Sequence, residues 1–232
     1  MAKPLDLQEQ EQLDEFKHFW KQYGGLISLL AIVVLGSFAA WNGWQYWQRT
    51  QSAQAAVMFE EVERSIVAGE PTKIERSLAD MKERYGSTVY AQQAGLAVAK
   101  AMVDKGNTDA ARAALAGVVA QSSDEGLRSV AKLRLAGLLL EKKLPDEALQ
   151  QLAGEFPAEF VALAADRRGD ILLAQGKKPE ARSEYEKAWK GLDERSDYRR
   201  LVEFKLNALG GDPVGAKLAQ TAAAPASGTS AP

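Results

Sequence analysis

The sequence predicts an all-α protein in which one membrane-spanning helix near the N-terminus precedes a solenoid of stacked helical hairpins. Three observations lead to this fold class. One long segment carries no charge and is rich in apolar residues, and the remainder is dominated by residues of high helix propensity. Within that remainder, small residues recur at a spacing of roughly 35 residues, which is typical of a repeat protein.

The predicted membrane helix comes first. No residue between Lys21 and Arg49 carries a formal charge. A charged residue at the centre of a membrane helix costs about 2.5–3.5 kcal/mol, so an uncharged window of this length favours the bilayer. As a helix its apolar stretch is about 31 Å long, close to the thickness of a hydrocarbon core. We therefore predict a transmembrane helix at residues 22–48, after a short cytoplasmic tail at residues 1–21.

Aromatic side chains flank both ends of this segment, as expected at membrane interfaces. They are Trp20 and Tyr23 on one side and Trp41, Trp44 and Trp47 on the other. These aromatics, and an acidic, glutamine-rich leader in place of a short basic one, favour an uncleaved anchor over a cleaved signal peptide or a buried core helix. The sequence Ser37-Phe38-Ala39 would nevertheless fit a signal-peptidase site.

Charge gives the orientation only weakly. Lys17 and Lys21 precede the segment and Arg49 follows it, so the positive-inside rule slightly favours a cytoplasmic N-terminus. The short tail and the much longer C-terminal region favour the same orientation, because a signal anchor would carry the larger part across the membrane. We predict that the N-terminus is cytoplasmic.

Composition argues against several classes of function. The chain has 29 basic and 31 acidic residues, and both its excess charges lie in the tail, so the remainder is neutral and nucleic-acid binding is not expected. It has no cysteine, and its single histidine, His18, adjoins the predicted membrane segment. No catalytic triad, glycine-rich phosphate loop or metal-ligand pattern can be assembled. We predict no cofactor, no metal and no enzymatic activity.

Residues 49–211 are predicted to form the solenoid. Gly106, Ala111 and Arg112 recur 70 residues later as Gly176, Ala181 and Arg182, and an intermediate copy surrounds Ala148. This spacing is typical of tetratricopeptide repeats, in which small residues allow paired helices to approach closely. The predicted packing residues are Ala99, Ala111, Ala136, Ala148, Gly169, Ala181 and Tyr185. An unrelated alanine-rich helical bundle is the alternative.

Flanking segments complete the predicted stack. Residues 51–68 and 71–85 would form a degenerate first hairpin, and residues 196–209 a solubilising cap. The second repeat departs from the pattern, with a shifted loop and Glu155 where a small residue is expected. Residues 212–232 are too poor in large apolar residues to fold, and we predict a disordered Ala/Pro/Ser tail there.

The first helix of each hairpin is expected to line a concave groove that binds a partner. The predicted groove residues are Leu96, Lys100, Val103, Val130, Leu133, Leu140, Leu163, Asp166, Asp170 and Leu173. An apolar groove with an acidic end would suit an extended or helical apolar segment. Alternatively, some of these leucines belong to the core or lie under the C-terminal cap.

Several segments resemble one known family, the YfgM-type ancillary subunits of the bacterial SecYEG translocon. They are the tail EQEQLDEFKHFWKQYG, the start of the span GGLISLL, the aromatic stretch WNGWQYWQ and the turn ERYGSTVYAQQAGLAVAK. The resemblance covers approximately residues 6–209. It implies a single-pass bacterial inner-membrane protein with its repeats in the periplasm.

The resemblance also implies partners. These are the SecYEG translocon, a membrane-anchored periplasmic chaperone of the prolyl-isomerase type and exported polypeptides. The function would be to assist newly exported chains without catalysis. A repeat scaffold for another cell-envelope machine, in cell-wall synthesis or outer-membrane assembly, is the alternative.

Overall fold

The computed structural model describes residues 7–212 and residue 215, and all its regular elements in those ranges are helices. They are α1 (Leu7–Ala68), α2 (Pro71–Tyr85), α3 (Val89–Asp104), α4 (Thr108–Gln121), α5 (Glu125–Glu141), α6 (Pro145–Gln151), α7 (Ala158–Ala174), α8 (Lys178–Gly191) and α9 (Asp197–Ala208). The predicted all-α fold class is confirmed. Contacts divide the chain into two units, with the boundary between Gln54 and Ala55.

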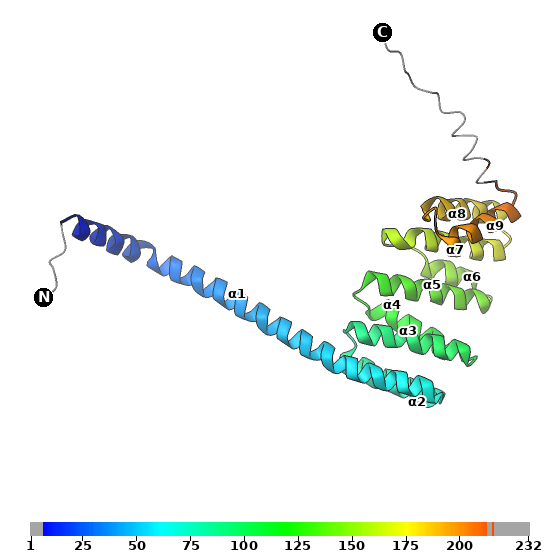
Figure 1. The fold of residues 1–232 in the computed structure, drawn as a ribbon, viewed down its shortest axis with the longest axis horizontal. Coiled ribbons are helices and arrows are strands. Elements are labelled where there is room, and N and C mark those ends of the chain that lie inside the picture. The colour runs from blue at the N-terminus through cyan, green and yellow to red at the C-terminus, as the bar shows by residue number, and fades with distance from the viewer. Residues whose placement is uncertain (1–6, 213–214, 216–232) are drawn as a thin grey trace, which may run out of the picture. The chain divides into compact units, whose positions relative to one another are not determined.

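The first unit consists of the N-terminal part of α1, which is blue in Figure 1. This helix is long and apolar enough to cross a membrane, and its apolar side chains are mostly exposed. Its polar side chains bond to the helix itself: the Ser37 hydroxyl donates to the Val33 carbonyl (2.7 Å), and the Asn42 amide donates to the Phe38 carbonyl (2.9 Å). Such internal bonds lower the cost of placing polar groups in hydrocarbon.

The second unit begins within α1 and contains the helical hairpins. Ala55 and Val62 of α1 are buried in one core cluster with Ile74 and Leu78 of α2. The hydroxyl groups of Ser65 on α1 and Ser77 on α2 lie 2.8 Å apart. The predicted first hairpin is therefore present, and α2 has the predicted limits.

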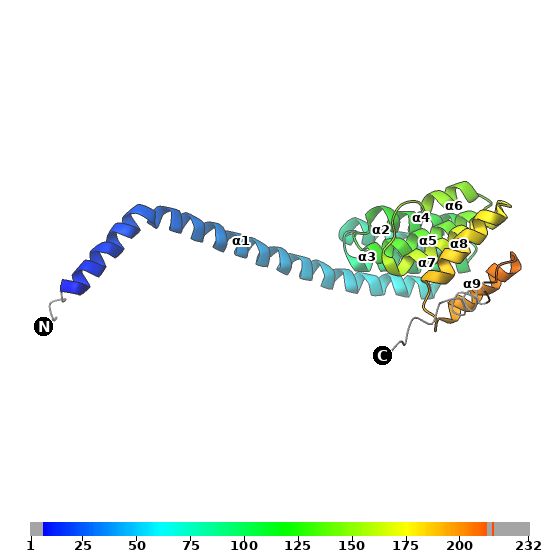
Figure 2. The ribbon, with the colours of Figure 1, turned by 90° about the horizontal axis from the view of Figure 1, so that it is seen from above.

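Successive hairpins α3/α4, α5/α6 and α7/α8 pack in chain order, and α9 follows α8 at the end of the stack (Figures 1 and 2). The first helices also contact one another, α3 with α5 and α5 with α7, and so form one row. Side chains set the starts of several helices. Thr88, Asn107 and Asp124 accept hydrogen bonds from the backbone N–H three residues ahead, which satisfies donors that a helix leaves unpaired.

The same turn ends α3, α5 and α7. It has one residue in the left-handed region in each repeat: Gly106 (φ 75°), Lys143 (φ 60°) and Gly176 (φ 77°). The N–H of the following residue donates to a carbonyl five residues back, at 2.8–2.9 Å in all three turns. This is the Schellman closure of a helix C-terminus. The repetition of the turn fixes how each second helix reverses onto the first.

The second repeat is shortened in the structure. Helix α6 has seven residues, whereas α4 and α8 each have 14. It ends before Gly154, which has a φ of 83°, and before Pro157, which precedes α7. Glu155 lies in the loop between α6 and α7, so the irregular second repeat predicted from the sequence arises from a truncated helix. The span at 22–48 and the tail at 1–21 stay predictions, and most of the predicted C-terminal tail lies outside the described residues.

Candidate partner-binding groove

Small residues in the interior allow the two helices of each hairpin to pack closely. The structure places Ala99, Ala111, Ala136, Ala148 and Ala181 in the interior, with at most 2% of each exposed. Gly169 on α7 faces the ring of Tyr185 on α8, which is itself buried. A Cβ at Gly169 would lie 2.5 Å from Cε1 of that ring, a distance that heavy atoms do not tolerate. The absence of a side chain at this position therefore allows α7 and α8 to approach.

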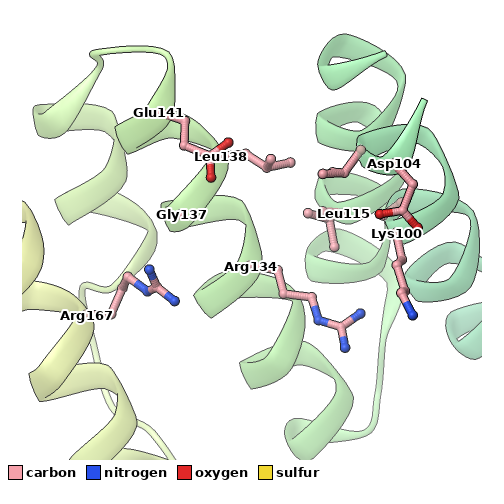
Figure 3. A pocket seen from close by; sticks show the side chains of 10 residues that line it. Lys100, Asp104, Leu115, Arg134, Gly137, Leu138, Glu141 and Arg167 are labelled. Carbon is pink, nitrogen blue, oxygen red and sulfur yellow. The ribbon is translucent and has the colours of Figure 1, made fainter. Parts of the chain in front are cut away.

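A groove of about 340 Å³ lies across α3, α5 and α7, with one residue contributed by α4 (Figure 3). Its apolar lining includes Leu115 and Leu138, and its charged lining combines basic and acidic side chains. The full lining comprises Ala99, Lys100, Val103, Asp104, Leu115, Arg134, Gly137, Leu138, Glu141 and Arg167. The first helices of three hairpins thus line a concave surface, as expected from the sequence for the first helices of such a stack.

Two of the predicted groove residues, Lys100 and Val103, line this groove and are exposed. Leu96, Leu133 and Leu140 are half-buried and pack against the core. Val130 and Leu163 are also half-buried, and Leu173 is exposed outside the groove lining. The structure therefore brings together a smaller part of the predicted set, and the half-buried leucines act at least in part as core.

Asp166 and Asp170 do not form the open acidic end that the sequence suggested. Asp166 is 1% exposed, and its carboxylate accepts bonds from Lys205 Nζ (2.8 and 2.9 Å) and from the Tyr198 hydroxyl (2.5 Å). Lys205 Nζ also lies 2.7 Å from Asp170. Because α9 brings both Lys205 and Tyr198 to α7, both carboxylates are already engaged within the chain, and Arg167 lies 3.8 Å from Asp170.

The same cluster holds two phenols in their neutral form. Burial raises the pKa of Tyr185 well above its usual value, and its hydroxyl donates a 2.8 Å bond to Asp170, which raises it further. Burial and the bond to Asp166 likewise raise the pKa of Tyr198. Both tyrosines serve as hydrogen-bond donors at neutral pH. The Tyr185 hydroxyl joins α8 to α7, and the Tyr198 hydroxyl joins α9 to α7.

Sequence reasoning missed Arg134, Arg167, Asp104 and Glu141 as groove residues. A comparison of repeat positions could have found them. Arg134 and Arg167 each stand two residues before a small packing residue, and Asp104 and Glu141 each stand five residues after one. In an amphipathic helix, recurrence at the same repeat position indicates a shared face.

No group of three or more metal-ligating side chains occurs within the residues that the structure describes. On α1, the predicted interfacial aromatics Trp20, Tyr23, Trp41, Trp44 and Trp47 are all exposed. The rings of Trp44 and Trp47 lie 5.3 Å apart, centroid to centroid. Two features could therefore contact a membrane or a partner: an apolar helix flanked by aromatic side chains, and a groove lined by charged side chains.

A helix able to cross a membrane, followed by hairpins closed by small residues, defines a tetratricopeptide-repeat-like protein with a candidate N-terminal anchor. The family model described as a tetratricopeptide repeat-like domain matches residues 17–211. Three curated relatives are each named ancillary SecYEG translocon subunit. The one from Neisseria gonorrhoeae is 32% identical over 88% of this chain and 98% of its own length.

The relative from Escherichia coli is 30% identical over 87% of this chain and 96% of its own length, and that from Haemophilus influenzae is 30% identical over 88% and 98%. The chain belongs to the family of ancillary SecYEG translocon subunits, which confirms the family resemblance found in the sequence. No solved structure matches it.

Proposed function

We propose that this chain is a non-enzymatic, single-pass scaffold of the bacterial inner membrane that associates with the SecYEG translocon and assists exported proteins. One observation carries the proposal: the relatives named as translocon subunits match almost their entire length, through both the α1 segment and the hairpins. In this proposal the N-terminus is cytoplasmic and the hairpins lie in the periplasm. A membrane-anchored chaperone of the prolyl-isomerase type is the second partner.

Crosslinking in native membranes tests the partners. Val161 on α7 and Val89 on α3 are about half exposed, so a photo-activatable residue at either position samples the hairpin surface without disturbing the core. We expect crosslinks to SecYEG subunits and to the chaperone at native expression levels. Recovery of cell-wall or outer-membrane assembly proteins instead, without SecYEG, would favour the alternative scaffold.

Orientation has a separate test, because the chain contains no cysteine. Ser123 is exposed between α4 and α5, so Ser123→Cys places a single thiol on the hairpin unit, and Ala2→Cys places one in the tail. A membrane-impermeant maleimide added to intact spheroplasts should label the Ser123→Cys variant, and should label Ala2→Cys after lysis. The reverse pattern would show that the hairpins are cytoplasmic.

A further inference from the structure

We propose that the groove across α3, α5 and α7 binds an extended polypeptide segment that carries acidic side chains between apolar ones. The acidic side chains would lie against Arg134 and Arg167, and the apolar ones against Val103, which is exposed in the lining. This inference rests on the proposed scaffold function and specifies the chemistry of the segment that the scaffold holds.

The groove lining has three basic side chains and two acidic ones, Asp104 and Glu141. Arg134 and Glu141 are separated by two turns of α5, which is about 10 Å along the helix. Figure 3 shows the side-chain nitrogens of Lys100, Arg134 and Arg167 toward one end of the groove and the Glu141 carboxylate toward the other, with the Asp104 carboxylate between them, near Lys100. Three successive first helices thus supply a basic row along the groove.

Two of the three basic residues in this row are available to a ligand. In the described part of the chain, neither Lys100 nor Arg134 forms an ion pair, and Arg134 makes one long contact, 3.5 Å, to the Leu96 carbonyl. Arg167 lies 3.8 Å from Asp170, which is already held by Lys205 at 2.7 Å. Lys100 and Arg134 therefore favour an anionic partner on this side of the groove by charge complementarity.

The lining favours a polypeptide over a lipid headgroup. Val103 is the exposed apolar side chain of the lining, and Gly137 leaves room within the groove, since a Cβ there would first meet Arg167, 3.6 Å away. A headgroup would use the cations and leave the apolar side chain of Val103 exposed. An extended chain directs alternate side chains to the same side, so apolar and acidic groups can enter the groove together.

Peptide binding to the full-length chain in detergent micelles tests the inference. The probe is a short fluorescent peptide in which leucine and glutamate face the same side when extended, and its control carries lysine in place of glutamate. Fluorescence anisotropy should show binding of the acidic peptide, weakened by added NaCl because salt screens exposed charges. Arg134→Glu should weaken that binding about fivefold or more.

Arg112→Glu is the matched control variant, because Arg112 is an exposed arginine on α4, outside the groove lining. It should leave the affinity unchanged, and circular dichroism should show the same helical content in both variants. Arg134→Gln repeats the test without a reversed charge. Equal binding of the acidic and basic peptides, or an unchanged affinity in both Arg134 variants, would overturn the inference.

Displacement of the acidic peptide by vesicles of anionic lipid, but not by neutral ones, would assign the groove to lipid and also overturn it. These outcomes are distinct from those of the scaffold proposal. Crosslinks to SecYEG report on association of the whole chain, whereas peptide affinity reports on the groove alone. The chain could therefore recover SecYEG while the groove inference fails.

Discussion

The contact between Gly169 and the Tyr185 ring makes a sharp stability prediction. The ring cannot shift easily, because Tyr185 is buried and its hydroxyl is bonded to Asp170 at 2.8 Å. A methyl group at Gly169 would therefore force α7 and α8 apart. We expect Gly169→Ala to lower the free energy of unfolding by about 1–3 kcal/mol, measured by chemical denaturation.

Gly137 on α5 provides the control, since it stands one position beyond the residue equivalent to Gly169. A methyl group added there would have the side chain of Arg167 as its nearest neighbour, at an ordinary contact distance of 3.6 Å. Alanine is the better helix former by up to about 1 kcal/mol, so Gly137→Ala should leave stability unchanged or raise it. Equal losses in the two variants would show that the Tyr185 contact is not the cause.

In one of the three equivalent turns, the left-handed position is occupied by a lysine, Lys143, instead of a glycine. Its φ of 60° lies in the left-handed region, whereas Gly106 and Gly176 occupy the same position in the other repeats. A side chain in this conformation costs about 1–2 kcal/mol. Lys143→Gly should therefore raise the Tm of the hairpin unit, and Gly176→Ala should lower it. A lower Tm for Lys143→Gly would mean that the lysine side chain stabilises the turn by more than its backbone strain.

At the scale of the element, α9 is attached to α7 by buried charge. Lys205→Met would leave the Asp166 carboxylate, 1% exposed, with Tyr198 as its remaining donor among the bonds described above. Loss of one partner of a buried ion pair costs about 3–5 kcal/mol. We expect α9 to detach locally, seen as faster hydrogen exchange of its backbone amides, while α3–α6 keep their protection.

Two further variants show whether the docking of α9 depends on the buried charges or on apolar packing. Lys205→Met combined with Asp166→Asn removes both charges and should recover part of the lost protection. Lys190→Met on α8 removes an exposed lysine and should change nothing. If the double variant is no better protected than Lys205→Met, the apolar contacts of Val202 and Leu206, both buried, determine the docking instead.

Local signals explain why most elements could be predicted. Glycine and proline mark the breaks, and α2 begins and ends where predicted, at Pro71 and Tyr85. The predicted cap at 196–209 exceeds α9 by one residue at each end. Helix capping, turn chemistry and the 3.6-residue period are all short-range, so a single sequence is enough to locate them.

Long-range pairings could not be predicted in the same way. The sequence pattern placed Asp166 on the inner face of its helix, but its partner Lys205 is 39 residues away on α9. Which carboxylates stay open to a ligand depends on that docking. The second repeat was expected to be irregular, but the sequence did not indicate how short α6 is; the helix ends before Gly154 and Pro157.

At the scale of the whole chain, one helix contributes to two structural units. The first 54 residues form one unit, and the buried core of the second begins at Ala55. From this division we expect the hairpin unit to fold without the first 54 residues. Exposed apolar side chains such as Leu30 and Phe38 belong to the first unit, so its removal should leave a water-soluble remainder.

A fragment of residues 55–212 tests that division. It keeps Ala55 and Val62, which are buried against α2, and the hydroxyl contact between Ser65 and Ser77. We expect it to be soluble without detergent and to unfold cooperatively on heating, as followed by circular dichroism. A fragment of residues 71–212 exposes Ile74 and Leu78 and should have a clearly lower Tm, because burial of each such side chain contributes about 1.5–3 kcal/mol. Equal stability of the two fragments would show that the end of α1 adds nothing to the core, and insolubility of the longer one would show that the hairpins need the anchor to fold.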